Sequence, residues 1–211
     1  MKFVVTAGPT REAIDPVRYL SNRSSGKMGY ALAAAALAQG HRVTLISGPV
    51  CLTPPEGATL VHALTADAMF DAVHAATRAC DVLVMCAAIA DFKAAQIASS
   101  KIKKQNAPAS LALAPTRDIL SSLPRARNYF VAGFAAETND LAQNAQEKLA
   151  RKHCDMLIAN DVSDDAIGFE SDENAVTIFF RDGKTREIAR LSKKNLACEL
   201  VKIISETAKK F

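Results

Sequence analysis

The chain has 211 residues, of which 49% are hydrophobic, and a formal net charge of +4. This length suits one domain, which we place over residues 1–211, and the hydrophobic fraction excludes a disordered chain. The longest apolar run, around residues 30–38, is too short and too small-sided to cross a membrane. The mild charge, without a dense basic tract or any tryptophan, argues against nucleic-acid binding.

The first predicted strand, residues 3–5, is followed by a long loop and an alanine-rich helix over residues 29–39. The start Met1-Lys2-Phe3 leads directly into this strand, so we expect no signal peptide. Ser24-Ser25-Gly26-Lys27-Met28-Gly29 opens the helix, and free backbone amides there suit a phosphate. The alternative is an ordinary N-cap with glycines for close packing. The loop before it has room for a second substrate.

The second strand, residues 43–46, ends in Ser47-Gly48 rather than in the acidic residue that binds a dinucleotide's ribose. The first loop also lacks the three-glycine spacing of dinucleotide-binding proteins. An NAD(P)-dependent oxidoreductase therefore remains only a rival interpretation. After a helix over residues 66–77 and a strand over residues 82–85, small residues lead to Asp91. This carboxylate is a candidate for magnesium or a ligand hydroxyl, or for a turn cap.

Residues 92–110 hold few large apolar side chains and contain the basic cluster Lys101-Ile102-Lys103-Lys104. We expect a mobile lid loop here that carries a lysine to a polyphosphate. A helix over residues 117–123 and a strand over residues 129–132 follow. Phe134 follows this strand and is interpreted either as a residue that stacks on a base or sugar or as part of the core. Glu137 is a candidate for binding magnesium or for capping.

The last third predicts a helix over residues 141–152, a strand over residues 156–159 and a hairpin over residues 175–189. Lys148 and Lys152 share one face of the helix, either toward a ligand or as a solvent stripe. Asn160 and Asp161 are candidates for a turn cap or for hydrogen bonds across an interface. Asp182-Gly183 predicts a two-residue turn, and a helix over residues 193–209 closes the chain. Strands that alternate with helices predict a Rossmann-like α/β fold with a mostly parallel sheet flanked by helices.

The cysteines and histidines give no catalytic or metal-binding pattern. Five cysteines are scattered without a Cys-x-x-Cys pair, which argues against a disulfide framework and a zinc site and favours the cytoplasm. The four histidines are isolated and lack a nearby nucleophile, so no Ser-His-Asp or Cys-His arrangement is indicated.

Several short strings of residues are distributed along nearly the whole chain. They are Thr6-Ala7-Gly8-Pro9-Thr10-Arg11-Glu12, Ile14-Asp15-Pro16-Val17-Arg18-Tyr19, Ser21-Asn22, Ser24-Ser25-Gly26-Lys27-Met28-Gly29, Cys86-Ala87-Ala88, Ala90-Asp91, Lys101-Ile102-Lys103-Lys104, Gly133-Phe134-Ala135-Ala136-Glu137-Thr138 and Ala159-Asn160-Asp161-Val162-Ser163. Together these strings resemble the phosphopantothenoylcysteine synthetase family of coenzyme A biosynthesis. Each string alone is weak, but their shared order and spacing are specific.

The resemblance implies a ligase that joins 4'-phosphopantothenate to L-cysteine. In this family a carboxylate attacks the α-phosphate of CTP or ATP, pyrophosphate leaves, and the cysteine amine then displaces the nucleotide from the acyl-nucleotidylate. It implies CTP in a bacterial member, Mg²⁺ with the triphosphate, unknown metal ligands, and a homodimer with sites near the subunit interface. The flavin-dependent decarboxylase half is missing, so no flavin is expected. A separate phosphopantothenoylcysteine decarboxylase is a possible partner. The chain is either a free-standing synthetase or an excised domain, and the start at Met1 favours the former.

The resemblance also assigns site residues by motif. Asn22 would bind the reacting carboxylate with help from Arg18, and Lys101 would be the lysine of the lid. Ala87, Ala88 and Asp91 would border the pantothenate together with Asn22. The nucleotide positions are Gly8, Ser24, Gly26, Gly29, Met85, Cys86, Ala87, Asp91, Lys101, Arg117, Asp118, Ile119, Leu120, Phe134, Lys148 and Lys152.

Two matters stay open at the level of the sequence. Thr116-Arg117-Asp118-Ile119 departs from the family's usual Asn-Pro-Asp-Ile, which weakens the assignment of the base contact. A non-catalytic nucleotide sensor would keep the phosphate loop and tolerate the loss of Asn22 and Lys101, whereas a ligase would not.

Overall fold

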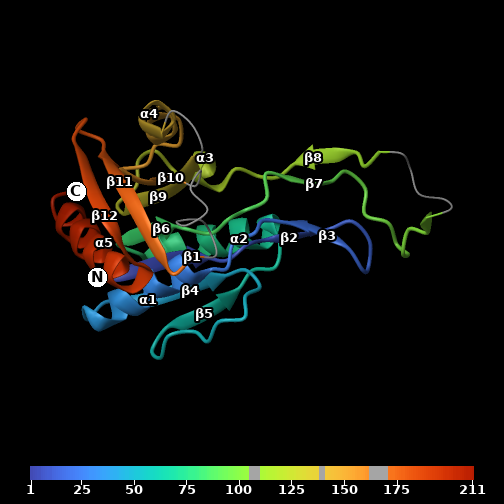
Figure 1. Cartoon of the computed structure of the whole chain (residues 1–211), viewed down its shortest axis with the longest axis horizontal. Coiled ribbons are helices and arrows are strands. Elements are labelled where there is room, and N and C mark those ends of the chain that lie inside the picture. Colours follow the sequence, from blue (N-terminus) through green and yellow to red (C-terminus); the bar gives the residue numbers. More distant parts are fainter. Residues whose placement is uncertain (105–109, 138–140, 162–170) are drawn as a thin grey trace.

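The computed structural model describes residues 1–104, 110–137, 141–161 and 171–211, without the side chains of residues 136, 137, 141, 142 and 161. A large sheet with the strand order β12-β11-β10-β9-β6-β1-β4-β5 forms its centre (Figure 1). Six of these strands are parallel, and β11 and β12 extend the sheet in antiparallel fashion. The parallel strands are β1 (Lys2–Ala7), β4 (Arg42–Ser47), β5 (Thr59–His62), β6 (Val82–Met85), β9 (Phe130–Glu137) and β10 (Met156–Asp161).

The order of the parallel strands reverses between β1 and β6. Counted along the chain, the six strands lie in the order 3-2-1-4-5-6, which is that of dinucleotide-binding Rossmann domains. The predicted fold class is therefore confirmed. Ligands of such sheets bind outside the carboxyl ends of the strands beside this reversal, so the topology alone points to the loops that follow β1 and β6.

Helices cover both faces of the sheet. α1 (Lys27–Ala38) and α5 (Lys193–Ala208) pack on one face, and α2 (Ala66–Ala76), α3 (Ile119–Ser122) and α4 (Leu141–Arg151) on the other; the 3-10 turn η1 (Thr77–Ala79) follows α2. Within β1, Phe3 and Val5 face the first layer while Val4 faces the second. This explains the apolar run of β1, since a strand buried on both faces has no polar side. No helix in the described ranges is long and apolar enough to cross a membrane.

Gly29 lets α1 lie directly on β1. A Cβ at this position would lie 2.5 Å from the Cβ of Ala7 and 3.0 Å from the carbonyl oxygen of Thr6. Helix propensity favours alanine over glycine, but overpacking costs about 1–3 kcal/mol. We expect Gly29→Ala to lower the Tm by several degrees, measured by thermal unfolding followed by circular dichroism. An unchanged or higher Tm would show that α1 can shift without cost.

Two antiparallel ribbons project from the sheet and form an arm. The arm consists of β2 (Arg11–Ala13) with β3 (Tyr19–Ser21), β7 (Phe92–Ala94) with β8 (Leu113–Pro115), and the segments between them that the structure describes (Figure 1). The backbone N–H of Ala98 donates to the carbonyl of Ile14 at 3.0 Å, which ties the ribbons together. The predicted lid over residues 92–110 thus begins as part of a ribbon; residues 105–109 lie outside the described ranges.

A buried carboxylate, Asp15, joins the two ribbons near the end of the arm. It accepts hydrogen bonds from the Arg18 side chain, from the backbone of Val17 and Arg18, and from the backbone of Ile102 at 3.2 Å. The Arg18 guanidinium holds the pKa of Asp15 far below its usual range against the opposing effect of burial. The conformation of the lysine segment therefore depends on Asp15.

We expect Asp15→Ala to loosen the arm and leave the sheet intact, because it removes the acceptor shared by both ribbons. Hydrogen exchange at the Ile102 amide should accelerate at least about tenfold, while amides in β1 and β6 keep their protection. Exchange at Ile102 equal to that of the wild type would show that the ribbons hold together without Asp15.

The remaining differences from the sequence predictions concern lengths and turns. The ribbons and β5 were not predicted, and β9 runs to Glu137, so Phe134 lies within a strand rather than after one. The predicted hairpin is present as β11 (Glu173–Phe180) and β12 (Thr185–Ser192). Its turn has three residues rather than two, because the N–H of Phe180 donates to the carbonyl of Lys184 and Gly183 takes a φ of 84°.

Candidate functional site

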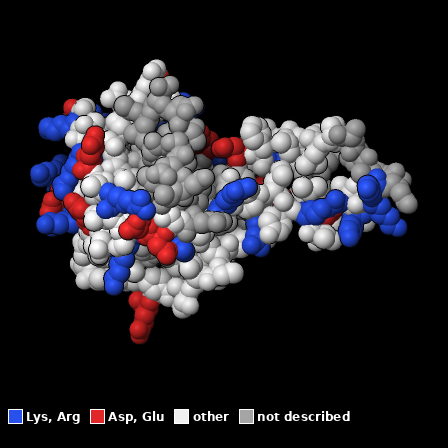
Figure 2. All heavy atoms as spheres, in the orientation of Figure 1, with Lys and Arg blue, Asp and Glu red and all other residues white. Residues whose placement is uncertain are grey.

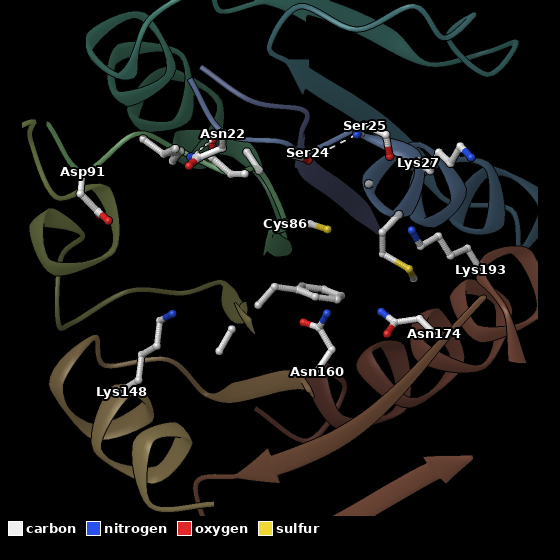
Figure 3. A pocket seen from close by; sticks show the side chains of 18 residues that line it. Asn22, Ser24, Ser25, Lys27, Cys86, Asp91, Lys148, Asn160, Asn174 and Lys193 are labelled. Atoms are coloured by element: carbon white, nitrogen blue, oxygen red, sulfur yellow. Dashed lines mark hydrogen bonds between the residues drawn. The ribbon is translucent and has the colours of Figure 1, made fainter. Parts of the chain in front are cut away.

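A cavity of about 360 Å³ opens at the carboxyl ends of the central strands (Figure 3). It lies beside the reversal of strand order, where a doubly wound sheet places its ligand. Its wall comes from the first loop, the start of α1, the loop after β6, and β9, β10, β11, α4 and α5. The lining residues are Asn22, Ser24, Ser25, Gly26, Lys27, Met28, Gly29, Cys86, Ala87, Ala88, Ile89, Asp91, Phe134, Ala135, Lys148, Asn160, Asn174 and Lys193.

Two buried threonine hydroxyls fix the backbone that lines this cavity. The Thr6 hydroxyl accepts the N–H groups of Cys86 and Ala87, both at 3.1 Å. The Thr10 hydroxyl accepts the N–H of Ala90 at 3.0 Å. Because both threonines are fully buried, the loops after β1 and β6 are held as one rigid surface against which a substrate can be positioned.

Asn22 extends from the base of the arm to the wall of the cavity. Its side-chain nitrogen donates to the carbonyl of Ala88 at 3.0 Å. This contact brings Asn22 beside Ala87 and Ala88. Three of the four residues assigned to the substrate therefore lie together. The fourth, Asp91, lines the same side of the cavity (Figure 3).

The N-terminus of α1 faces the cavity without a side-chain cap. Gly26 is the N-cap residue, in the left-handed conformation with φ of 78°, and as a glycine it has no side chain that could cap the helix. Uncapped amides at a helix N-terminus bind anions well. Gly8, also at positive φ, lies beneath Gly26 rather than in the cavity, and a Cβ on Gly26 would come within 3.3 Å of the Cα of Gly8.

Cationic side chains lie at both ends of the cavity. Lys148 extends from α4 at one end, and Lys193 from α5 at the other, with Lys27 next to it (Figure 3). Lys27 forms an ion pair of 2.6 Å with Asp172. Between the ends, burial raises the pKa of the Cys86 thiol to about 12, which favours the protonated thiol near neutrality.

Several assigned residues lie outside the cavity. Arg117 is paired with Asp67 at 2.8 Å and Asp71 at 3.0 Å on α2 and stacks 3.9 Å from the centre of the Phe70 ring. Because α2 holds its guanidinium, Arg117 does not line this cavity, and its assignment to the nucleotide stays a prediction. Met85, Ile119 and Leu120 pack in the core layer beneath the cavity.

Asp118 and Lys152 pair with each other rather than facing the cavity. Asp118 caps α3 by accepting the N–H of Ser121 at 3.1 Å, and it receives the Lys152 ammonium. Although burial opposes it, the hydrogen bonds from Lys152 and Ser121 lower the pKa of Asp118. Within one chain these two residues stabilise the α3–α4 corner.

Arg18 and Lys101 lie on the arm and do not line the cavity of their own chain. Arg18 is fixed by Asp15 and donates to the carbonyl of Ile102 at 2.9 Å, and Lys101 is exposed. Lysines and arginines gather at the tip of the arm (Figure 2). The two cationic residues assigned to the reaction are therefore together, but apart from Asn22.

The cavity also contains residues that the sequence did not indicate, above all Asn174 and Lys193. Lys193 is only 7% exposed, although the pair Lys193-Lys194 reads as an ordinary solvated helix start. Asn174 follows residues 162–170, which the structure does not describe. No motif marks either position; only the return of β11 beside β10 brings them to the cavity.

Among the described residues, no three His, Cys, Asp or Glu side chains form a metal-binding cluster. Asp91 is a single carboxylate at the cavity. Mg²⁺ is commonly held by one or two carboxylates and the substrate's phosphates, so Asp91 fits a magnesium ion that arrives with a nucleotide. The structure does not describe the side chains of Glu137 and Asp161.

The strand order, with a cavity beside its reversal, defines a Rossmann-like α/β protein. The profile of the DNA/pantothenate metabolism flavoprotein C-terminal domain family matches residues 1–208. The chain belongs to this family, and the resemblance found in the sequence is confirmed.

Relatives and solved structures agree with this family. The coenzyme A biosynthesis bifunctional protein CoaBC of Bacillus subtilis (strain 168) is 46% identical over 208 residues, 98% of this chain and 51% of the relative. That of Escherichia coli (strain K12) is 43% identical over 95% of this chain and 50% of the relative. The chain thus spans about half the length of these relatives.

Two solved structures place the fold among known proteins. The crystal structure of the C-terminal domain of a CoaBC protein has a TM-score of 0.85 and 36% identity, covering all of this chain and 96% of that one. A Cab2 mutant in complex with phosphopantothenate-cysteine has a TM-score of 0.83 but 16% identity over 99% of this chain and 86% of that one, so it supports the fold alone.

Proposed function

We propose that this chain is a phosphopantothenate–cysteine ligase that uses CTP and forms an acyl-cytidylate. The observation that carries the proposal is that Asn22 and the N-terminus of α1, where Gly26 provides no side-chain cap, line the same cavity. This arrangement offers a donor for a carboxylate beside a site for phosphates. The relatives named for coenzyme A biosynthesis support the same pathway.

The first step transfers the nucleotidyl group to the substrate carboxylate. The carboxylate oxygen attacks the α-phosphorus of CTP, the bond to the bridging oxygen breaks, and pyrophosphate leaves. The Asn22 amide is positioned to orient that carboxylate, and the α1 amides and the cavity's lysines to stabilise the phosphates. A carboxylate is a poor acyl donor until its oxygen becomes a good leaving group, which the nucleotidyl group provides.

The second step forms the amide. The cysteine amine attacks the acyl carbon of the mixed anhydride, CMP leaves, and the amine loses a proton. Phe134, half-buried in the cavity wall, offers an aromatic face to the nucleoside. Mg²⁺, held by Asp91 and the phosphates, would neutralise charge on the leaving pyrophosphate.

We also propose a homodimer in which the arm completes the site of the partner. Six of the eight large apolar side chains exposed in the described ranges lie on the arm: Val17, Tyr19, Phe92, Ile97, Leu111 and Leu113. Exposed apolar groups gathered on one projection favour a protein contact. The partner's cavity would then receive Arg18 and Lys101, which the chain's own cavity lacks.

The cysteines and the relatives bear on where the protein works and with which partner. All five cysteines are free thiols, which suits the reducing cytoplasm. The curated relatives are bifunctional proteins about twice as long. A phosphopantothenoylcysteine decarboxylase, fused or separate, is the partner that would consume the product.

Pyrophosphate release with phosphopantothenate and Mg²⁺ tests this function. With CTP, we expect sustained release that requires cysteine and a stoichiometric burst without it. The same assay with ATP decides the nucleotide. Absence of release with both nucleotides would contradict a ligase and favour a nucleotide sensor, whereas turnover of NAD(P)H would favour an oxidoreductase.

A further inference from the structure

Both ribbons of the arm are attached to the first turn of α2, where the arm leaves the sheet (Figure 1). From the first ribbon, the buried carboxylate of Glu12 in β2 accepts the backbone N–H of Ala66 at 2.7 Å. The N-cap residue of this helix, Thr65, accepts the N–H of Ala68 instead. A carboxylate at a helix N-terminus is favourable, so a charge-assisted hydrogen bond fixes β2 to the helix.

The second ribbon is attached through Asp67, the second residue of α2. One oxygen of its carboxylate accepts the ammonium of Lys93 in β7 at 2.7 Å, and the other accepts the Nε–H of Arg117, which follows β8, at 2.8 Å. Arg117 also donates to the backbone carbonyl of Asp67 at 3.2 Å. A single side chain of the helix therefore holds both strands of the ribbon at their base. We call Asp67, Lys93 and Arg117 the Asp67 clamp.

The clamp has the features that make a partly exposed ion pair effective. An isolated surface pair stabilises a protein little, because water and salt screen it and two flexible side chains must be ordered. Here one carboxylate joins two cations, and the guanidinium of Arg117 has further contacts. It donates to Asp71 at 3.0 Å and lies 3.9 Å from the centre of the Phe70 ring. The hydrogen bonds from Lys93 and then from Arg117 lower the pKa of Asp67 against the effect of burial, so the carboxylate is ionised near neutrality.

The base of the arm matters because the arm is a lever. Lys101 lies toward the far end of the ribbon that begins at Lys93, so a small rotation at the base displaces Lys101 much further. Further out, the ribbons are held to each other, through the N–H of Ala98 on the carbonyl of Ile14 and through Asp15. Contacts of this kind preserve the shape of the arm, whereas the contacts with α2 set its direction.

From these contacts we propose that Asp67 is a positioning residue of the ligase: its clamp sets the direction of the arm and thereby places Lys101 at the phosphates in the partner's site. This rests on the proposed function and on the homodimer proposed with it. Asp67 does not line the cavity, so its effect on the reaction passes through the arm. A lysine on an arm without a fixed direction would be correctly placed only part of the time, and orientation of a catalytic group supplies a large share of a rate enhancement.

Asp67→Asn tests the clamp, because it removes the charge and keeps the shape of the side chain. We expect the kcat of ligation to fall roughly 10- to 100-fold, the loss typical of a displaced catalytic group. Asp71→Asn is the matched control, because Asp71 is an exposed carboxylate of the same helix that pairs with Arg117, while Lys93 pairs with Asp67. It should keep the kcat of the wild type, since Arg117 retains its contacts with Asp67. Equal kcat of Asp67→Asn and the wild type would overturn the proposal.

A double-mutant cycle with Lys101→Gln separates positioning from a general loss of structure. If Asp67 acts through Lys101, Asp67→Asn should lower the remaining rate of Lys101→Gln by about twofold at most, because no ammonium is left to position. A purely structural role would lower the rate by the same factor in both backgrounds. Equal losses in the wild type and in Lys101→Gln would therefore overturn the proposal.

Hydrogen exchange tests the clamp without requiring turnover. At the base of the ribbon, the N–H of Thr116 donates to the carbonyl of Asp91 at 2.9 Å. Exchange at Thr116 should accelerate about tenfold in Asp67→Asn, while amides in β1 keep their protection. Lys93→Met, which breaks the clamp from the side of the ribbon, should have the same effect and serves if Asp67→Asn does not fold.

The two measurements distinguish a failure of the clamp from a failure of the proposed function. Wild-type exchange at Thr116 in both Asp67→Asn and Lys93→Met would contradict the clamp, even where the wild type is an active ligase. If the wild type makes no phosphopantothenoylcysteine, the proposed function fails, and faster exchange in the variants still shows that Asp67 holds the arm.

Discussion

Asn22→Asp should abolish ligation while the protein stays folded. The change replaces a donor beside the Ala88 carbonyl with a carboxylate that faces the substrate's own carboxylate. Loss of a preorganised donor typically costs about 100-fold or more in rate, and the added repulsion increases this loss. The measurement is pyrophosphate release and product formation, with the melting temperature recorded in parallel.

Asn195→Asp is a suitable control, because Asn195 is an exposed residue of α5 that does not line the cavity. It should keep the rate of the wild type. The binding of CTP to Asn22→Asp should change little, since α1 and the lysines are unaltered. Full ligation by Asn22→Asp would remove Asn22 from the reaction and favour the interpretation as a nucleotide sensor.

Lys101→Gln should lose most turnover, and a mixture with Asn22→Asp should recover part of it. In a two-fold dimer whose sites combine Asn22 of one protomer with Lys101 of the other, a mixed dimer has one intact site. If subunits exchange at random from an equal mixture, half of the dimers are mixed, so the recovered activity should be about a quarter of that of the wild type. The assay follows pyrophosphate release after the two variants are incubated together.

Lys103→Gln is the control for this experiment, because Lys103 is an exposed lysine in the same segment. It should remain active and should not be needed for complementation. A mixture as inactive as its components would show that Lys101 does not act across subunits. Full activity of Lys101→Gln by itself would show that Lys101 is a solvated surface residue without a part in the reaction.

The central layers of the molecule could be predicted from the sequence because they follow from local patterns. The continuous apolar runs of β1 and β6 indicate strands that are buried on both faces, and the alternation of strands with helices implies a parallel sheet. The arm could not be predicted, because it follows no such local pattern. Its strands have three residues each and expose apolar side chains such as Phe92, so neither length nor periodicity marks them.

The sequence alone determined the family, the strand–loop–helix start and the identity of Asn22, because these depend on residue types at short spacings. The tertiary structure decided which residues share the cavity. Lys193 and Asn174 reach it only because β11 returns beside β10 and α5 packs on α1. Arg18 and Lys101 lie away from it on the arm, where Asp15 links the ribbon that carries Arg18 to the segment that carries Lys101. Contacts between residues far apart in the sequence depend on the strand order and on packing, and no local pattern encodes either.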